Sequence, residues 1–335
     1  MVNIAVLGCG RIGVMHARNI ANHPRASLAT VFDIHQPSAD KVAAELGVKT
    51  SRSIEEILAN PAVDAILIAT STNTHADILE LAVAAGKPIL CEKPIDLSLA
   101  RVNACFEKIR NSKVPIMQGF VRRFDPGHRA TRDAVRRGDV GELHQVTITS
   151  RDPAMAPDAY IRVSGGIFRD MTIHDFDMAR FMLGEEPVEV SATGSRLVNP
   201  ALMDELQDYD TVVVSLRTAS GKQCVITNSR QAVYGYDQRV EALGTLGLAS
   251  SQNRKNHEAT LHTKTFTERS EPYQNFFIER YSEAFAAEIS EFVDAIENKR
   301  EPEVGFADGR LALMLAEAAL KSVQTGKVVH MSEMD

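Results

Sequence analysis

Residues 3–13 read NIAVLGCGRIG, a short and mostly apolar run that ends in the pattern G-x-G-x-x-G. A continuous run of this kind is typical of a strand buried on both faces of a sheet, and the glycines open the helix that follows. Asp33 stands twenty residues after Gly13, at the end of the next predicted strand. Strand, glycine turn, helix and acidic residue in this order predict a dinucleotide-binding unit. The alternative is a glycine turn that binds nothing, and the agreement of all four elements weighs against it.

The three glycines of this turn have separate expected roles. Gly8 permits a tight turn, Gly10 lets the backbone approach a pyrophosphate, and Gly13 lets the helix lie close to the strand. The helix begins at about Arg11 and Ile12, where unpaired N–H groups and the helix dipole favour an anion. We therefore expect these five residues to hold the pyrophosphate of the cofactor.

Asp33 predicts which dinucleotide is bound. Its carboxylate would accept hydrogen bonds from the ribose hydroxyls and would repel a 2′-phosphate. The next residues are Ile34 and His35, so no arginine follows that could pair with such a phosphate. The sequence favours NAD over NADP.

The first 120 residues alternate short apolar runs with helical patterns. This rhythm predicts a parallel, doubly wound α/β sheet, a Rossmann domain over residues 1–120. The predicted strands are Asn3–Leu7, Ser27–Phe32, Ala65–Ala69, Pro88–Cys91 and Ile116–Gly119. The predicted helices are Ile12–Asn22, Ala39–Leu46, Ile54–Ala59, His75–Ala85 and Ser98–Arg110.

The pattern changes after residue 120, where alternating or β-branched runs dominate. Few helices separate them, which predicts an α+β domain over residues 121–335 with a large, mostly antiparallel, open sheet. The predicted strands are Leu143–Arg151, Val188–Ser195, Thr211–Leu216, Gln223–Arg230 and Arg239–Gly244. Helices are expected at Gly165–Leu183, Tyr281–Asn298 and Ala307–Gln324, and the last one could pack on the first domain.

Composition narrows the class of protein. The 335 residues carry 37 basic and 44 acidic side chains, a net charge of −7, so bulk attraction to nucleic acid or to an anionic membrane is not expected. The four cysteines are far apart without C-x-x-C, which indicates neither a zinc site nor a disulfide framework. Membrane-length apolar runs and a secretory signal are absent from the sequence. We expect a cytoplasmic protein.

Glu92-Lys93-Pro94 directly follows the fourth predicted strand. Ligands bind at the carboxyl ends of parallel strands, so Lys93 is expected at the edge of the sheet where it could act on a substrate. A lysine there could stabilise an alkoxide that develops during oxidation of an alcohol. A surface lysine beside a turn proline is the alternative.

Asp170 and His174 form the second candidate site. They are four residues apart and would share a helix face. His174 can accept a proton near neutral pH, and Asp170, or Asp177 one turn further on, would favour the imidazolium form. Structural roles for these residues are the alternative. A third metal ligand at suitable spacing is missing from this segment, so we expect no metal.

These motifs together resemble the Gfo/Idh/MocA oxidoreductases over nearly the whole chain. The resemblance rests on the glycine turn, Ala69-Thr70 with Thr74-His75, Glu92-Lys93-Pro94, residues 118–126 (QGFVRRFDP) and Asp170-x-x-x-His174. It implies a catalytic triad of Lys93, Asp170 and His174, with His174 as the general base and Lys93 polarising the reacting oxygen. We also expect Thr70, Glu92 and Lys93 to contact the NAD cofactor.

Further stretches resemble the myo-inositol 2-dehydrogenase branch of that family. They are residues 150–153 (SRDP), 165–170 (GGIFRD), 230–239 (RQAVYGYDQR) and 273–281 (YQNFFIERY). The branch implies NAD-dependent oxidation of myo-inositol to 2-keto-myo-inositol, a homotetramer assembled through the open sheet, and polyol contacts from Asp152, Tyr236 and Tyr281. Some members have His and Asn where this chain has Ser150 and Asp152. Tyr236 and Tyr281 could instead be core or interface aromatics.

Three other functions remain open from the sequence. The first is a dehydrogenase of another cyclic polyol or aldose, such as scyllo-inositol or glucose, with the same Lys93, Asp170 and His174. The second is a non-catalytic NAD-binding sensor, which would not need a proton acceptor beside the nicotinamide. The third is a hydrolase that retains NAD for a transient oxidation.

Overall fold

The computed structural model describes residues 1–334, which form two compact units. The first unit contains residues 1–124 and 283–311, and the second contains residues 125–282 and the described residues from 312 onward. The chain therefore enters the first unit twice.

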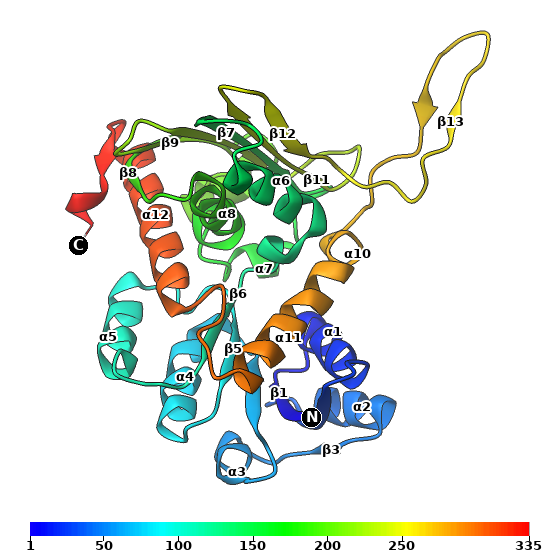
Figure 1. The fold of residues 1–335 in the computed structure, drawn as a ribbon, viewed down its shortest axis with the longest axis vertical. Coiled ribbons are helices and arrows are strands. Elements are labelled where there is room, and N and C mark those ends of the chain that lie inside the picture. Colours follow the sequence, from blue (N-terminus) through cyan, green and yellow to red (C-terminus); the bar gives the residue numbers. More distant parts are fainter. Residues whose placement is uncertain (335) are drawn as a thin grey trace. The chain divides into compact units, whose positions relative to one another are not determined.

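A six-stranded parallel sheet forms the centre of the first unit (Figure 1). Its order is β3-β2-β1-β4-β5-β6, so the chain reverses direction across the sheet between β1 and β4, which is where doubly wound sheets bind ligands. The central strands consist of apolar residues that are buried on both faces, as β4 shows with four consecutive buried residues. The strands are β1 (Val2–Leu7), β2 (Ala26–Phe32), β3 (Lys49–Thr50), β4 (Ala65–Ile68), β5 (Ile89–Glu92) and β6 (Ile116–Gly119).

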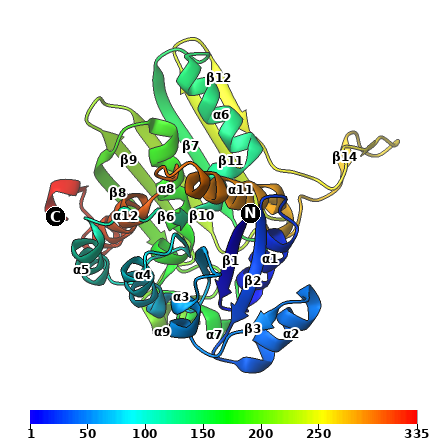
Figure 2. The same ribbon diagram turned by 60° about the horizontal axis from the view of Figure 1, so that its bottom comes forward.

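Helices cover both faces of this sheet, with α4 and α5 on one side and α1 and α2 on the other (Figures 1 and 2). Ser53 and Ser98 cap two of the helices by accepting a hydrogen bond from a backbone N–H of the first turn. The helices of this part are α1 (Arg11–Ala21), α2 (Gln36–Leu46), α3 (Ile54–Ala59), α4 (His75–Ala84) and α5 (Leu99–Ile109), with short 3₁₀ turns at Thr72–Thr74 and Val121–Phe124.

Residues 283–311 complete the first unit. They contain nearly all of α11 (Ser282–Glu297) and the start of α12 (Phe306–Thr325). Arg25, just after α1, forms ion pairs with Asp294 and Glu297 of α11 at 2.6 and 2.8 Å. The edge strand β6 is covered as well, because the Gln118 amide donates to the Val304 carbonyl at 3.0 Å.

The second unit is built on a seven-stranded sheet of order β12-β11-β7-β10-β9-β8-β15. All its pairs are antiparallel except β7 with β10, which is parallel. Exposure alternates along β9, so one face of the sheet is open to solvent in the single chain. The strands are β7 (Leu143–Arg151), β8 (Pro187–Ser195), β9 (Thr211–Thr218), β10 (Gln223–Ser229), β11 (Asp237–Gly244), β12 (Leu248–Ser251) and β15 (Val329–His330).

The helices of this unit are α6 (Pro126–Arg137), α7 (Asp158–Ile161), α8 (Ile173–Leu183), α9 (Pro200–Leu206), α10 (Phe277–Arg280) and the rest of α12, with a π-helical turn at Phe168–Thr172 and a 3₁₀ turn at Met331–Glu333. Of these, α6 packs on β11 and β12, and α8 packs on β7 and β10. A two-stranded ribbon, β13 (Thr260–Leu261) with β14 (Arg269–Ser270), extends from the unit. Among the described residues, no helix is long and apolar enough to cross a membrane.

The predicted fold class is confirmed, since a parallel Rossmann sheet is followed by a mostly antiparallel sheet. The five N-terminal strands appear within one residue of their expected limits at each end. The sequence analysis did not predict β3, α6 or β12, nor the parallel pairing of β7 with β10.

Candidate active site

The three glycines of the turn between β1 and α1 have different surroundings. Gly8 has a φ of +98°, and a Cβ there would lie 2.3 Å from the Ala69 carbonyl oxygen. A Cβ on Gly13 would lie 1.9 Å from the Gly8 carbonyl oxygen, so the helix can approach the turn only without a side chain. A Cβ on Gly10 would meet no atom within 4 Å. The space over Gly10 is therefore where a ligand can approach the backbone at the start of α1.

Asp33 follows β2 and faces the same turn. Its Oδ2 accepts a hydrogen bond from the Cys9 amide at 2.7 Å, and its Oδ1 accepts one from the His35 amide at 2.8 Å. An ionised carboxylate offers about four acceptor positions, so these two bonds leave capacity for ribose hydroxyls. Burial and the Asp33 charge raise the pKa of the Cys9 thiol to about 11, so this thiol stays protonated.

The loops after β4 and β5 are joined by His75. Its Nδ1 lies 2.9 Å from the Pro94 carbonyl oxygen and its Nε2 lies 3.1 Å from that of Thr70. The Thr70 hydroxyl also bonds the Thr74 hydroxyl at 2.7 Å. His75 thus fixes the positions of Thr70 and of the loop that carries Lys93. In the sequence, His75 was noted only within a motif and as the first residue of a predicted helix, and that position was the available signal.

Glu92 and Lys93 stand at the carboxyl end of β5. One Glu92 oxygen lies 2.7 Å from His16 Nε2, and the other accepts the Lys93 amide at 3.3 Å. Gly119 on β6 leaves room for this side chain, because a Cβ there would lie 3.0 Å from Glu92 Oε2. The sequence analysis missed His16, which is a buried polar residue inside an amphipathic helix pattern.

The residues of the first unit fit a dinucleotide. The open space over Gly10, the uncapped start of α1 and the Asp33 carboxylate correspond to pyrophosphate and ribose positions. Thr70 comes shortly after β4, Glu92 ends β5 and Lys93 follows it, and the carboxyl ends of these neighbouring strands meet at the same edge of the sheet.

In the second unit, Asp170 is held by two side chains that the sequence analysis did not predict. It lies in the π-helical turn that precedes α8 and accepts a hydrogen bond from the Tyr160 hydroxyl at 2.6 Å. Its other oxygen accepts one from Arg230 at 3.0 Å, and Arg230 is almost completely buried. Loss of hydration and the Asp170 charge raise the pKa of Tyr160, so that hydroxyl donates. π-Helical turns of this kind recur at functional sites.

His174 lies on α8, four residues beyond Asp170, and its side chain is partly buried. The neighbouring carboxylates have structural partners. Asp175 accepts a hydrogen bond from Asn228 at 2.8 Å, and Asp177 lies 3.6 Å from Arg180.

The three predicted polyol contacts lie in the same unit as Asp170. The Asp152 amide donates to the Ser229 carbonyl at 3.0 Å, next to the end of β7. Tyr236 and Tyr281 are buried and pack edge to face with ring centres 6.1 Å apart. The Tyr281 hydroxyl lies 3.4 Å from His128 Nε2, so it has a partner inside the core.

Two family models match this chain. The model described as "Oxidoreductase family, NAD-binding Rossmann fold" matches residues 2–120, and the "GFO/IDH/MocA C-terminal domain" matches residues 128–250. This chain is a Gfo/Idh/MocA oxidoreductase. The resemblance drawn from its motifs is confirmed, as is the NAD-binding character of its first domain.

Several relatives of this oxidoreductase are similar over almost their full length. The Inositol 2-dehydrogenase of Rhizobium meliloti is 48% identical over 96% of this chain and 97% of its own. The Myo-inositol 2-dehydrogenase of Thermotoga maritima is 42% identical over 99% of both chains. A solved structure of scyllo-inositol dehydrogenase from Lactobacillus casei, with bound cofactor NAD(H) and scyllo-inositol, has a TM-score of 0.91 at 27% identity and covers 99% of each chain.

Proposed function

We propose that this oxidoreductase oxidises myo-inositol at its axial 2-hydroxyl to 2-keto-myo-inositol with NAD⁺. The observation that carries the proposal is the 42–48% identity, over at least 96% of each chain, to relatives named as inositol 2-dehydrogenases. The chain also retains a lysine, a histidine and a carboxylate of the kinds that alcohol oxidation requires.

The roles of the residues follow from the charges that form during the reaction. When bound, NAD⁺ supplies the hydride acceptor at C4 of its nicotinamide ring. His174 accepts the hydroxyl proton at a ring nitrogen, and general-base catalysis of this kind typically raises the rate by roughly 10²–10⁴-fold. The Lys93 ammonium group stabilises the negative charge that develops on the oxygen.

Asp170 supports this proton transfer as a carboxylate. Tyr160 and Arg230 each donate a hydrogen bond to one of its two oxygens, so the carboxyl group is held in place four residues before His174. A carboxylate near His174 then favours the imidazolium that forms when the proton arrives. Arg230 and Tyr160 are positioning residues in this scheme.

The proposal assigns recognition of the polyol hydroxyls to Asp152, Tyr236 and Tyr281. It also includes a homotetramer that covers the open face of the seven-stranded sheet, on which Val213 is exposed. Four free, buried cysteines agree with a reducing, cytoplasmic location.

The test is NADH formation by the purified protein with NAD⁺ or NADP⁺ and a panel of myo-inositol, scyllo-inositol, chiro-inositol and glucose. We expect the fastest turnover with NAD⁺ and myo-inositol. Faster turnover of another polyol would keep the mechanism and change the substrate. If NAD binds and no polyol is oxidised, a sensor or an NAD-retaining hydrolase replaces the proposal.

Lys93→Ala and His174→Ala test the catalytic roles. Each variant should bind NAD nearly as tightly as the wild type while kcat falls by about 10² or more. A variant that loses NAD affinity but keeps kcat at saturating NAD would remove that residue from the chemistry.

Scyllo-inositol is the second candidate substrate. A scyllo-inositol 2-dehydrogenase (NAD(+)) of Bacillus subtilis is 35% identical over 98% of this chain. Ser150 and Asp152, where this chain departs from some inositol dehydrogenases, lie at the end of β7, and the Ser150 hydroxyl donates to Gln238 at 2.9 Å.

A further inference from the structure

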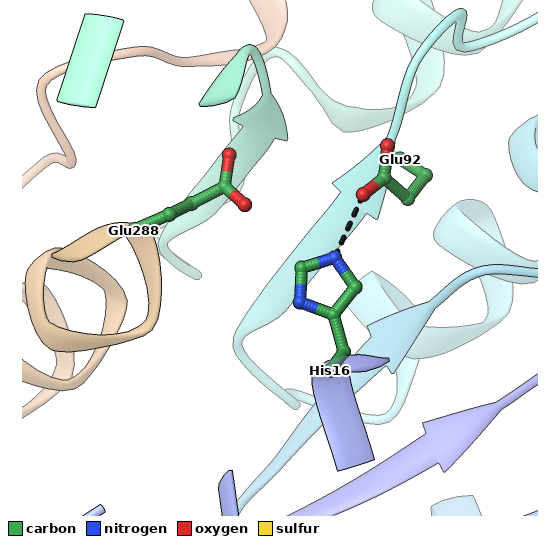
Figure 3. Close-up of side chains that lie close together, drawn as sticks. All are labelled: His16, Glu92 and Glu288. Atoms are coloured by element: carbon green, nitrogen blue, oxygen red, sulfur yellow. Dashed lines mark hydrogen bonds and ion pairs between the residues drawn. The ribbon is translucent and has the colours of Figure 1, made fainter. Parts of the chain in front are cut away.

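Three ionisable side chains meet in the interior of the first unit (Figure 3). His16 comes from α1, Glu92 from the end of β5, and Glu288 from α11, and all three point toward one another. His16 and Glu288 have no exposed surface, and the Glu92 side chain is 13% exposed. We call these three residues the buried triad. Neither His16 nor Glu288 has a role in the chemistry described above.

The contacts within the buried triad are unequal. His16 Nε2 lies 2.7 Å from one Glu92 oxygen, and the other Glu92 oxygen accepts the Lys93 amide. Both Glu288 oxygens, in contrast, have no hydrogen-bond partner in the structure, although one ligand atom from each residue lies within 4.8 Å of the others. The Glu288 carboxyl therefore lies near a second carboxyl and accepts no hydrogen bond, and His16 Nδ1 likewise has no hydrogen-bond partner.

The closeness of the two carboxyl groups determines how many of them can be ionised. Two ionised carboxylates this close would repel each other, and an unpaired buried carboxylate loses its hydration without recovering it. The unpaired member therefore binds a proton, as one carboxyl does wherever two share a site. Burial, and after it the charge of Glu92, raise the pKa of Glu288 well above its ordinary value. The charged and titratable groups around Glu92 are His16, Lys93 and Cys91.

A bound metal ion is the other explanation for such a cluster. A tetrahedral ion with ligands at about 2.0–2.1 Å needs its ligand atoms about 3.3 Å apart. The 2.7 Å between His16 Nε2 and Glu92 Oε1 is a hydrogen-bond distance. The geometry therefore favours a hydrogen bond between His16 and Glu92 over two ligands of one ion.

We propose that Glu288 is a neutral buried acid and that the buried triad is a positioning device for Lys93. With Glu288 neutral, no charge on Glu288 opposes the bond between Glu92 and His16, and the second Glu92 oxygen fixes the Lys93 amide. His75 holds the other side of Lys93 through the Pro94 carbonyl. The inference rests on the proposed role of Lys93 in the oxidation.

Infrared spectroscopy tests the protonation directly and needs no substrate. The difference spectrum between the NAD-bound wild type and the variant Glu288→Gln should contain the C=O stretch of a protonated carboxylic acid at about pH 7. Absence of this band at neutral pH would overturn the proposal. One metal ion per chain in the purified protein would overturn it as well.

Kinetics test the positioning role. Glu288→Gln keeps a neutral group of the same shape, so kcat should stay within about threefold of the wild type. His16→Leu removes the ring nitrogen that bonds Glu92, so kcat should fall about 10–100-fold while the Kd for NAD stays within about threefold. Ser290→Ala, on the same helix as Glu288, is the matched control and should change neither.

The combination with Lys93→Ala separates positioning from general damage. If His16 acts through Lys93, then His16→Leu should lower the residual kcat of Lys93→Ala by less than about twofold. Equal losses in both backgrounds, or a parallel loss of NAD binding, would refute the positioning role. If no polyol is oxidised while the infrared band is present, the proposed function fails and the protonated Glu288 stands. Should His16→Leu not fold, the infrared test still decides the protonation.

Discussion

Replacing Gly13 with alanine should damage the NAD-binding unit because of one contact. The new Cβ would lie 1.9 Å from the Gly8 carbonyl oxygen, against 3.4 Å where ordinary contact begins, a shortfall of 1.5 Å. The new Cβ is fixed to the backbone of α1, and the atoms that it meets belong to the backbone of Gly8. No side chain can rotate to relieve the clash, so α1 must move away from the turn. Overpacking of this kind costs about 1–3 kcal/mol of stability.

The matched control is Gly10→Ala. Its Cβ would meet no atom within 4 Å, and the φ of −73° is allowed for alanine. The free protein should therefore lose less than about 1 kcal/mol. The methyl group would occupy the space through which the pyrophosphate approaches, so NAD affinity should fall at least about tenfold, which is about 1.4 kcal/mol.

Calorimetric unfolding without cofactor, and titration with NAD, measure these two effects separately. For a unit of this size each kcal/mol corresponds to about 2–4 °C in Tm. Gly13→Ala should lower both Tm and NAD affinity, and Gly10→Ala should lower only affinity. Wild-type Tm in Gly13→Ala would contradict the close approach of α1 to the turn. Wild-type affinity in Gly10→Ala would move the pyrophosphate away from this backbone.

Three further changes have defined outcomes. Asp33→Ala should relax the preference for NAD over NADP, measured as the ratio of kcat/KM values, and an unchanged ratio would remove Asp33 from the ribose site. The pKa of Glu288 is raised in the folded state, so the free energy of unfolding of the wild type should fall by about 1.4 kcal/mol per pH unit as pH rises from about 5 toward that pKa. Urea unfolding measures this slope, and Glu288→Gln, which lacks the titrating group, gives the slope to subtract. Equal slopes in the two proteins would mean that Glu288 is ionised. Arg230→Met should cost about 3 kcal/mol of stability, because Asp170 loses its buried cation, and it should also lower kcat. A variant with wild-type kcat would show that Asp170 does not need this partner.

Local patterns in the sequence are sufficient for the elements and for the ends of strands that carry the site. The apolar run before Gly8, the glycine spacing and the position of Asp33 are properties of neighbouring residues, and they predicted β1, the turn, α1 and the end of β2. Glu92-Lys93 was likewise placed at the end of a strand, because a continuous apolar segment precedes it. The motifs also led to the family, which the family models confirm.

Contacts between distant segments were decided only by the tertiary structure. Nothing local in the sequence indicates that residues 283–311 return to the first unit, or that Arg230 pairs with Asp170 sixty residues earlier. The two-residue strand β3 and the parallel pairing of β7 with β10 likewise depend on which segments become neighbours. Glu288 looks like an ordinary helical glutamate until α11 packs on α1 and removes its water. Periodicity reports which face of an element is buried, whereas the protonation and the partner of a buried group depend on what the opposite element presents to it.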